Sequence, residues 1–466
     1  MSQTRIYDTI INTEPITKGW SEDKKYRVTT TGGEIYLLRI TPIARYETRK
    51  ALFAMLEQVA ALDIPMCKPI EFGTCDDGVY SIQSWIDGED LEDVLPTLTE
   101  AEQFKLGLKS GEIARGMHSI SAPDSQEEWS ARFSRKTDVK LQKYCECGLR
   151  FDGDEHVIAY IEQNRHLLKN RPQCFQHGDY HAGNMMLENG ELKIIDFDRY
   201  DFGDPWEEFN RIVWCAATSP HFATGQIKGY FGGEPPMEFW RLLTFYIASN
   251  TLSSIYWAIP FGESEIDTMM QQSQDVLRWY DNMRNPVPSW YLSGYELWDV
   301  YDENRNKTGR LHERGKPMTT GDYHIIVHVW KRNIKGEWLI DKRTPRYGNN
   351  DLDNKWETTG GCAVAGDDSL TAALRETREE LGIELNPQSG VLFSSTARKW
   401  EDGHTAFVDV WAFEYDESIE SVAFDGSEVC DAMWASADKI REMMASGELL
   451  DYPYFDEMVE KMEAAR

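Results

Sequence analysis

A pair of prolines in the second half of the chain constrains its possible folds more than any other single feature. The segment Asn285-Pro-Val-Pro-Ser289 interrupts helical periodicity, because proline lacks a backbone donor and disfavours helix in the residue before it. Helical spacing dominates from Thr99 to Asn170 and from Pro205 to Met283, whereas strand-like alternation returns after the break. The 466-residue chain is therefore predicted to form two domains, residues 1–288 and 289–466.

Short-range patterns predict individual elements on each side of this break. Gly32-Gly33 indicates a hairpin between strands Lys25–Thr31 and Glu34–Thr41, and Thr99 with Glu102 forms a helix-start pattern. In the first domain, a helix is further expected over Tyr46–Ala61, a strand over Val79–Ile86 and a hairpin around Asn189-Gly190. In the second domain, the expected strands are Tyr323–Trp330, Glu337–Lys342 and Ala406–Tyr415, and a helix is expected over Leu370–Leu381. The last helix is expected from Asp438 to about Met444. The expected fold class is α+β and multidomain.

Charge and cysteine content exclude several classes of function. The formal net charge is −30, spread along the chain, so the surface repels nucleic acid and anionic membranes, and neither is expected as a partner. Eight cysteines without a C-x-x-C pair or a zinc-ligand spacing indicate reduced thiols in a cytoplasmic protein. The N-terminal residues lack a basic region followed by an apolar run, so they are not expected to be a signal peptide. Polar residues interrupt the apolar stretch Leu242–Phe261, which is expected to be a buried helix rather than a membrane span.

The first chemical motif reads HGDYHAGN, ends at Asn184, and is followed twelve residues later by Asp196-Phe197-Asp198. Phosphoryl transfer needs a group that orients or deprotonates the attacking hydroxyl, and oxygen ligands that hold Mg²⁺ on a triphosphate. Asp179 suits the first role, and Asn184 and Asp196 suit the second. His177 is expected to brace the loop.

These two motifs resemble the catalytic signature of the aminoglycoside phosphotransferases and their relatives, which include the choline, homoserine and fructosamine kinases. Gly203-Asp204-Pro205-Trp206 adds to a resemblance that covers about residues 1–288. It implies a two-lobed protein-kinase-like fold that transfers the γ-phosphoryl group of ATP or GTP to the hydroxyl of a small molecule. It further implies that Asp179 is the catalytic base and that Asn184 and Asp196 bind Mg²⁺.

The same resemblance assigns residues upstream to the nucleotide site. Arg39 takes the strand position of a phosphate-binding lysine, and arginine can bind phosphate through two nitrogens. Glu47 on the following helix would be its ion-pair partner, with an ordinary exposed glutamate as the alternative. The backbone of Trp85 and Ile86, in the hinge between lobes, would bind the purine. The loop Gly19-Trp20-Ser21-Glu22-Asp23-Lys24-Lys25 departs from the family's G-x-G-x-x-G, so phosphate binding and a simple strand connection both remain open.

The second chemical motif lies on the predicted C-terminal-domain helix. Glu376, Glu379 and Glu380 fall at i, i+3 and i+4 and so share one helix face. Three neighbouring carboxylates repel one another, whereas divalent cations relieve the repulsion and can bridge two phosphates. The alternative is a solvated acidic helix with salt bridges from Arg375 and Arg378.

The string from Gly361 to Ile383 resembles the Nudix box. The resemblance implies a Nudix α/β/α sandwich in which Glu376, Glu379 and Glu380 hold Mg²⁺ or Mn²⁺ and Arg375 orients the carboxylates. Glu379 and Arg375 are then the catalytic residues of a reaction that cleaves the diphosphate of a nucleoside-diphosphate-linked substrate through metal-activated water.

Two residues depart from the box without removing a metal carboxylate: Asp367 replaces a glutamate and Thr377 replaces an aliphatic residue. Before the box, the stretch from Glu296–Val300 through His312–Gly315 to His324–Trp330 resembles the isopentenyl-diphosphate-isomerase-like branch. Between Arg343 and Gly361, however, there is neither the cysteine nor the histidine that isomerases need, so hydrolysis is expected. Glu428 is a further candidate acid.

The chain is thus expected to be a bifunctional, Mg²⁺-dependent small-molecule phosphotransferase and Nudix hydrolase. Four readings of its function stay open: a metabolic kinase for an amino alcohol or sugar, an antibiotic-modifying aminoglycoside kinase, a kinase whose Nudix part only senses nucleotide, and a Nudix enzyme with an inactive kinase scaffold. Intact motif residues in both parts argue against the last two. An aminoglycoside kinase would need an acidic acceptor pocket.

Overall fold

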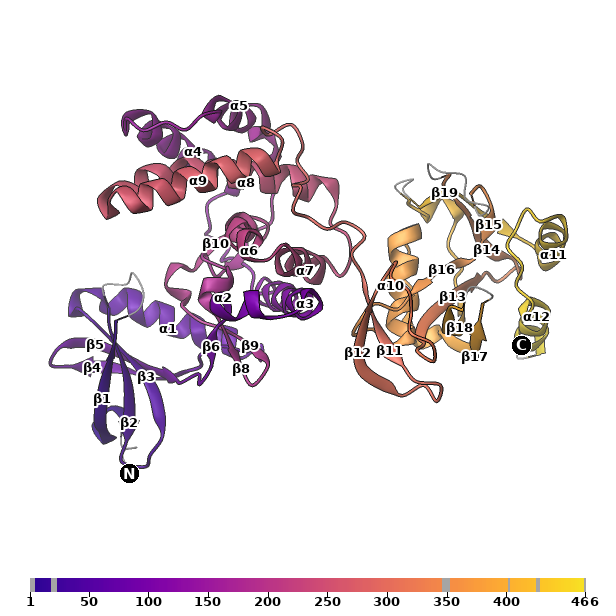
Figure 1. Cartoon of the computed structure of the whole chain (residues 1–466), viewed down its shortest axis with the longest axis horizontal. Helices are drawn as coiled ribbons and strands as arrows, with labels where there is room; N and C mark the ends of the chain where they lie inside the picture. Colours follow the sequence, from indigo (N-terminus) through magenta and orange to yellow (C-terminus); the bar gives the residue numbers. More distant parts are fainter. Residues whose placement is uncertain (1–4, 18–22, 346–352, 401–402, 425–427, 465–466) are drawn as a thin grey trace. The chain divides into compact units, whose positions relative to one another are not determined.

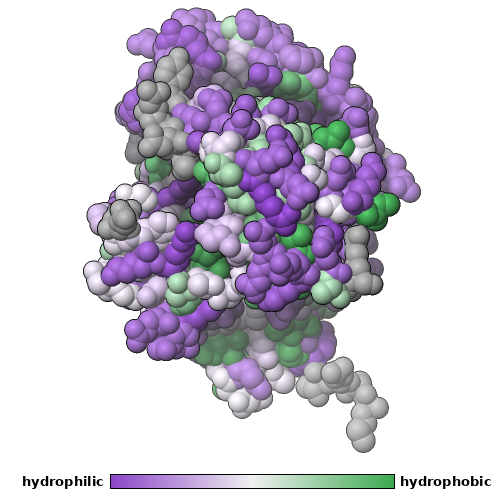
Figure 2. Space-filling model, turned by 90° about the vertical axis from the view of Figure 1, so that its right-hand side faces the viewer, coloured by the Kyte–Doolittle hydropathy of each residue, from purple (hydrophilic) through white to green (hydrophobic). Residues whose placement is uncertain are grey.

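The chain forms two compact units, Met1–Ser293 and Gly294–Arg466 (Figure 1). The computed structural model describes residues 5–17, 23–345, 353–400, 403–424 and 428–464. Gly19–Glu22 of the candidate nucleotide loop lie outside the described residues. On the face drawn in Figure 2, hydrophilic residues predominate and hydrophobic ones are scattered among them, as the large net charge requires.

The first unit begins with a small lobe whose five-stranded antiparallel sheet has the order β1-β2-β3-β5-β4. The predicted hairpin at Gly32-Gly33 is confirmed as β2–β3. β1 was not predicted, because this edge strand is largely exposed and carries no apolar alternation. The elements are β1 (Ile10–Ile16), β2 (Lys24–Thr30), β3 (Ile35–Thr41), α1 (Tyr46–Ala60), β4 (Pro69–Cys75) and β5 (Gly78–Ser84).

The second lobe of this unit is helical, with short strands that carry the loops of the first motif. The predicted capping box is confirmed, since Thr99 N donates to Glu102 Oε2 at 2.9 Å and Glu102 N to Thr99 Oγ1 at 3.3 Å. The elements are β6 (Glu89–Asp90), α2 (Leu91–Val94), α3 (Glu100–Met117), α4 (Trp129–Glu146), α5 (Asp154–Asn164), β7 (Cys174–Gln176), β8 (Met185–Glu188), β9 (Glu191–Ile194), β10 (Asp201–Gly203), α6 (Ile212–Thr218), α7 (Pro220–Phe231), α8 (Met237–Ala258) and α9 (Glu263–Trp279).

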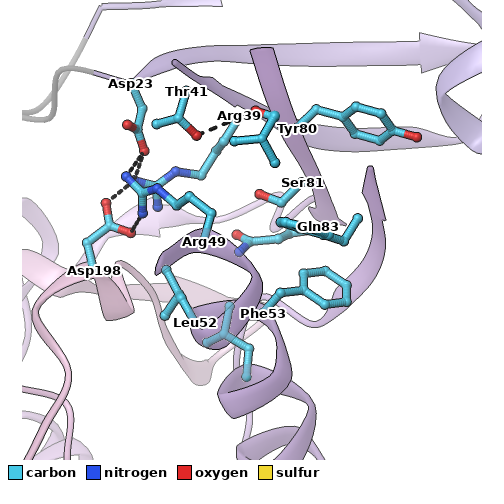
Figure 3. A pocket seen from close by; sticks show the side chains of 13 residues that line it. Asp23, Arg39, Thr41, Arg49, Leu52, Phe53, Tyr80, Ser81, Gln83 and Asp198 are labelled. Carbon is cyan, nitrogen blue, oxygen red and sulfur yellow. Dashed lines mark hydrogen bonds and ion pairs between the residues drawn. The ribbon is translucent and has the colours of Figure 1, made fainter. Parts of the chain in front are cut away.

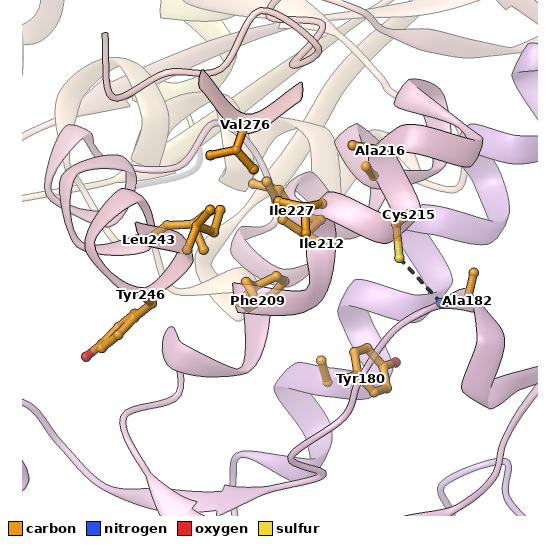
Figure 4. Packing of buried hydrophobic residues seen from close by; sticks show 14 of the residues in the cluster. Tyr180, Ala182, Phe209, Ile212, Cys215, Ala216, Ile227, Leu243, Tyr246 and Val276 are labelled. Carbon is orange, nitrogen blue, oxygen red and sulfur yellow. Dashed lines mark hydrogen bonds between the residues drawn. The ribbon is translucent and has the colours of Figure 1, made fainter. Parts of the chain in front are cut away.

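Helix α8 contains most of the apolar stretch that was expected to be a buried helix. Its Leu243 and Tyr246 lie in the core with Ile212 of α6 and Ile227 of α7 (Figure 4), and all four side chains are at most 1% exposed. Among the residues that the structure describes, no helix combines the length and hydropathy needed to cross a membrane.

Helices α3 and α7 approach each other so closely that their backbones touch. The contact depends on four glycines, where a Cβ would overlap the backbone of the opposite helix: Gly107, Gly111, Gly225 and Gly229. Within it, Gln226 Nε2 donates to Ser110 Oγ at 2.9 Å, and Tyr180 Oη donates to Ser110 O at 2.7 Å. Tyr180, the residue that follows Asp179, is therefore hydrogen-bonded to helix α3 within the α3–α7 contact.

The second unit is a sandwich around a seven-stranded sheet of order β15-β14-β13-β18-β17, with β16 paired to β13 and β19 to β14. β13 and β18 are parallel, and the other pairs are antiparallel. A separate hairpin, β11–β12, precedes the sheet. The strands are β11 (Leu297–Tyr301), β12 (Lys307–Glu313), β13 (His324–Arg332), β14 (Trp338–Arg343), β15 (Trp356–Glu357), β16 (Thr359–Cys362), β17 (Val391–Lys399), β18 (Thr405–Glu414) and β19 (Val429–Ala435).

Helices cover both faces of this sheet. α10 (Ser369–Leu381) closes one core, and α11 (Ala437–Ser446) and α12 (Phe455–Ala464) close the other. The prediction that the helix near Asp438 is the last one is wrong. The sequence contains the helical period of α12, whose buried apolar residues share one face: Phe455, Met458 and Val459.

Candidate active sites

The loop after β7 and the hairpin β8–β9 bring the residues of the first motif together. Asn184 Nδ2 donates to Asp179 O at 2.8 Å, and Ile195 N donates to Asn184 O at 3.0 Å. His177 Nε2 donates to Ile195 O at 2.9 Å, so its Nδ1 is left to accept from Asp179 N at 3.3 Å. His177 thus braces the loop against the segment that carries Asp196.

A buried carboxylate that the sequence did not single out supports this loop. Glu208 is 1% exposed and accepts from His177 N at 2.5 Å and from Gly178 N at 2.9 Å. Gly178 has φ +81°, and a Cβ there would overlap the backbone of Arg199. The sequence feature that could have identified this carboxylate is its place: Glu208 precedes the apolar Phe209 and lies just after the Gly203–Trp206 motif.

Asp179 faces basic groups. Arg211 Nε lies 3.3 Å from its carboxylate, and Arg199 Nε and His181 Nε2 lie 3.8 Å from it. Burial lowers the pKa of His181 to about 4, so this ring is neutral at pH 7. Two guanidinium groups therefore provide the positive charge next to Asp179.

Arg39 lies in a network of charges beside a small cavity, which is lined by residues of the small-lobe sheet and of α1 together with Asp23 and Asp198 (Figure 3). Arg39 is 8% exposed and reaches Asp23 at 3.1 Å and Asp196 at 3.4 Å, and it also hydrogen-bonds Asp198. Arg49 of α1 donates to the other oxygen of Asp198 at 2.7 Å. Burial alone would raise the pKa of Asp198, but the two arginines outweigh it and hold this pKa below its ordinary value.

The expected ion pair between Arg39 and Glu47 is wrong. Glu47 is exposed on α1, and among the described residues the ion pairs of Arg39 run to aspartates only. Side chains two positions apart on a helix point in directions about 200° apart. The side chain of Arg49 therefore points inward, whereas that of Glu47 points outward. Helix α1 therefore adds a second cation, Arg49, to the network. The carboxylate of Asp23 forms ion pairs with both Arg39 and Arg49 and so balances part of the added charge.

Trp85 and Ile86 follow β5 in the segment that joins the two lobes of the first unit. Asp87 N donates to Glu188 Oε1 at 2.7 Å, which attaches this segment to β8. The ring of Trp85 lies under the Arg27 guanidinium, 5.5 Å from its centroid, and its Nε1 is buried without a hydrogen-bond partner in the described part of the chain. The segment lies where a hinge is expected, and its contact with a purine stays a prediction.

In the second unit, Arg375 of α10 lies among acidic residues of that helix and of the segment before it. Its Nε is 3.0 Å from Asp367 Oδ2, and its Nη1 is 3.0 Å from Glu376 and 2.9 Å from Glu379. Its Nη2 donates to Cys362 O at 2.9 Å. The shorter Asp367 thus still reaches Arg375, which explains why the chain tolerates aspartate at that position.

The three carboxylates of α10 have raised pKa values. Burial raises the pKa of Glu376 to about 7, against the effect of Arg375, and it raises those of Glu379 and Glu380. Their oxygen atoms suit Mg²⁺ or Mn²⁺, whose charge would stabilise the ionised forms. As the side chains stand, no three His, Cys, Asp or Glu residues of the described ranges already enclose a metal position.

Strand β16 approaches α10 at a glycine. Gly361 pairs with Val327 of β13, and a Cβ on Gly361 would overlap the carboxylate of Glu376. A side chain at this position would therefore displace Glu376 from the strand. The fixed glycine of the motif allows the helix carboxylate to reach the strand backbone.

Comparison with known proteins identifies both units. The Phosphotransferase enzyme family matches residues 12–240, and the NUDIX domain family matches residues 322–456. The Nudix hydrolase lmo0368 of Listeria monocytogenes is 32% identical over 168 residues, which cover 35% of this chain and 93% of that protein. The Nudix hydrolase lin0387 of Listeria innocua is 32% identical over 171 residues, which cover 36% of this chain and 96% of that protein.

The chain belongs to the Nudix hydrolases and carries a phosphotransferase-family domain ahead of its Nudix domain. Both are enzyme families. Among solved structures, the Nudix part is similar to DR0079 from Deinococcus radiodurans (21% identity, TM-score 0.29, covering 36% of this chain and 98% of that one). The phosphotransferase part is similar to a thermostable mutant of aminoglycoside phosphotransferase APH(4)-Ia (16% identity, TM-score 0.44, covering 58% of this chain and 96% of that one).

We expect Glu208→Ala to destabilise the phosphotransferase domain by about 3 kcal/mol and to lower its turnover, because two buried N–H groups lose a charged acceptor. Calorimetric unfolding of the full chain measures this effect. Glu112→Ala, on the exposed face of α3, is the matched control. Unchanged unfolding of the Glu208 variant would show that Glu208 does not hold the loop.

We expect Gly361→Ala to lower Nudix turnover by about 10²-fold, because the displaced Glu376 would no longer meet its neighbours in the working geometry. Steady-state assays on a diphosphate substrate measure the loss. Cys362→Ala on the same strand removes a side chain without adding a clash and should retain activity. Equal activity of the two variants would contradict the role of the close approach.

Without divalent metal, we expect the stability of the wild-type Nudix domain relative to the Glu376→Gln variant to fall as pH rises from about 5 to 8. Burial lowers the pKa of His324 to about 3 and of His328 to about 4, which adds a pH dependence of the opposite sign that both proteins share. An unfolded glutamate titrates near 4.5 and folded Glu376 near 7, so the folded state binds more protons across this window and its stability falls with rising pH. Mg²⁺ should weaken this difference, because a bound cation stabilises the ionised carboxylate. The measurement is the unfolding temperature of both proteins in EDTA and in Mg²⁺ at pH 5.5 and pH 8; a difference between them that does not fall with rising pH in EDTA would contradict the assignment.

Proposed function

We propose that the chain is a bifunctional enzyme, with a small-molecule kinase in residues 1–288 and a diphosphate hydrolase in residues 289–466. The observation that supports the kinase most directly is the convergence of Asp179, Asn184 and the Asp196 segment through the bonds of His177 and Ile195. An arrangement of this kind suits one base and two oxygen ligands around a transferred phosphoryl group.

In the kinase, Asp179 takes up the proton of the substrate hydroxyl while the hydroxyl oxygen forms a bond to the γ-phosphorus of ATP or GTP. The bond from that phosphorus to the bridging oxygen breaks, and the nucleoside diphosphate leaves. Asn184 and Asp196 would hold Mg²⁺, which neutralises charge on the phosphates. Arg39 is the candidate phosphate contact, and the hinge backbone at Trp85 and Ile86 is the candidate purine contact.

In the hydrolase, Glu376, Glu379 and Glu380 would hold Mg²⁺ or Mn²⁺, which supplies an activated water and charge stabilisation. Arg375 fixes Glu376 and Glu379 through its two ion pairs. The proposed substrate is a nucleoside diphosphate linked to a second group, which is cleaved to two monophosphates. The gathered carboxylates favour catalysis over a role in nucleotide sensing alone.

Phosphorus NMR of the full chain with Mg²⁺, ATP, GTP and a pool of hydroxyl acceptors tests both activities. A new phosphomonoester signal that needs one acceptor supports the kinase. Conversion of an added nucleotide-linked diphosphate into two monophosphates supports the hydrolase. Absence of the first signal with every acceptor, while the second reaction proceeds, would reduce the proposal to a hydrolase.

A further inference from the structure

Two arginines of the small lobe converge on one carboxylate oxygen (Figure 3). Arg39 of β3 has its Nη2 3.1 Å from Asp23 Oδ2, and Arg49 of α1 has its Nη2 2.5 Å from the same oxygen. The Asp23 side chain is 1% exposed, so salt and water screen these ion pairs little. Asp23 directly precedes β2 and therefore reaches the arginines from a different segment than α1 or the first motif.

Asp198 joins the same two arginines to the first motif. Arg49 Nη1 donates to Asp198 Oδ1 at 2.7 Å, and Arg39 Nη2 donates to Asp198 Oδ2. Asp198 lies on the short helical turn Phe197–Arg199, which Asp196 directly precedes. The two guanidinium groups are therefore held beside the segment that carries the candidate Mg²⁺ ligand.

Arg39 also faces that candidate ligand. Its Nη1 lies 3.4 Å from Asp196 Oδ1, and the Asp196 side chain is more exposed than the other charged groups of the network. Phosphate groups held by a divalent cation at Asp196 would therefore lie within reach of Arg39, whose Nη2 already meets Arg49 at the Asp23 oxygen.

The network contains more carboxylates than cations. Its two guanidinium groups face three aspartates: Asp23, Asp196 and Asp198. Burial opposes the charge of Arg39, but the attraction of the aspartates outweighs it and raises the pKa of Arg39. A phosphate group that joined all three carboxylates would meet uncompensated negative charge at short range. It can therefore bind the two arginines only if one carboxylate leaves them.

Asp23 is the carboxylate that can be exchanged. Asp196 and Asp198 lie two residues apart at one turn, and the proposed reaction needs Asp196 for the cation. No part of that reaction falls to Asp23. A phosphate oxygen offers a guanidinium group the same kind of acceptor as a carboxylate oxygen does. The Asp23 oxygen that accepts from both arginines therefore marks a position where a phosphate oxygen could accept from both.

Resting on the kinase proposed above, we propose that Arg39 and Arg49 together bind the phosphates of the donor nucleotide, and that Asp23 takes the place of a phosphate oxygen while the nucleotide is absent. The donor then displaces the Asp23 carboxylate from both guanidinium groups. Asp23 consequently weakens nucleotide binding, whereas Arg49 strengthens it. A network that only held the structure together would respond in the same direction to the loss of either residue.

Calorimetric titration of the full chain with Mg·AMP-PNP and Mg·GMP-PNP tests this proposal. All samples carry Glu379→Gln, which suppresses the Nudix reaction. Asp23→Asn should bind the preferred analogue about tenfold more tightly, because the arginines are open to phosphate in a larger fraction of the molecules. Arg49→Gln loses a charged donor and should bind it about tenfold more weakly. The corresponding nucleoside, which lacks phosphate, should bind all variants alike.

Matched controls lie in the same lobe. Asp76→Asn and Lys50→Gln remove the corresponding charges at exposed positions and should leave every affinity unchanged. Arg49→Lys keeps the positive charge and should restore part of the affinity that Arg49→Gln loses. Asp23→Ser removes the same charge as Asp23→Asn with a smaller side chain, so it provides a second measurement if the first variant does not fold.

Unchanged or weaker binding of the nucleotide analogue by the Asp23 variants would overturn the inference, and so would unchanged binding by Arg49→Gln. Equal shifts for the nucleoside and the analogue would also overturn it, because the effect would then not concern the phosphates. If the parent chain binds neither analogue, the kinase on which the inference rests is removed as well.

Discussion

Asp179→Asn should reduce phosphotransferase turnover by about 10²–10⁴-fold and leave the Nudix reaction unchanged. The amide keeps the size of the side chain and can still hydrogen-bond, but it cannot accept the proton of the attacking hydroxyl. The backbone bond from Asn184 Nδ2 to the carbonyl of residue 179 does not involve the altered group. The loop should therefore keep its shape.

The measurement is acceptor-dependent conversion of ATP to ADP, with Nudix activity assayed on the same sample. Asp124→Asn, at an exposed position of the same domain, is the matched control. If Asp179→Asn retains full turnover, Asp179 is not the base. If it eliminates both activities in a folded protein, the two sites are not independent.

Glu379→Gln should produce the opposite pattern, with a loss of Nudix turnover of about 10²-fold or more and an unchanged kinase. The substitution removes a charged oxygen ligand. It also weakens the interaction with Arg375, whose Nη1 lies 2.9 Å from Glu379 Oε2 in the wild-type chain. The 13-residue helix that carries it should persist, because Glu379 is partly exposed and not part of the core.

Hydrolysis of a nucleotide-linked diphosphate over a range of Mg²⁺ concentrations measures this effect, since a lost ligand should also raise the Mg²⁺ needed for half-maximal rate. Glu384→Gln, exposed just beyond the helix, is the control. Wild-type turnover at every Mg²⁺ concentration would exclude Glu379 from the metal site. A parallel loss of kinase activity would indicate misfolding instead.

Motif spacing predicted the parts of each site that are local in sequence. Glu376, Glu379 and Glu380 share a face because helix geometry fixes side-chain direction, and Asp179 with Asn184 depend on a single loop. Both families that these motifs suggested are confirmed by the comparisons. Periodicity likewise predicted α1, α10 and the β2–β3 hairpin, whose boundaries differ from the expected ones by at most one residue at each end.

The contacts that sequence did not reveal join residues far apart in the chain. Arg49 meets Asp198 across 149 positions, and Glu208 supports a loop 30 residues earlier. Neither follows a local period, because tertiary packing alone decides which charge faces inward. The Arg39–Glu47 prediction failed for this reason, since family position alone does not fix which of two nearby residues points into the cleft.

The glycine contact between α3 and α7 has a genetic consequence. Because Ser110 links that contact to Tyr180, a side chain inserted at Gly107 or Gly229 would push the helices apart and shift the neighbour of Asp179. Such alleles should be temperature-sensitive for phosphorylation alone and should complement, in trans, an allele defective only in diphosphate cleavage. One gene would then behave as two complementation groups.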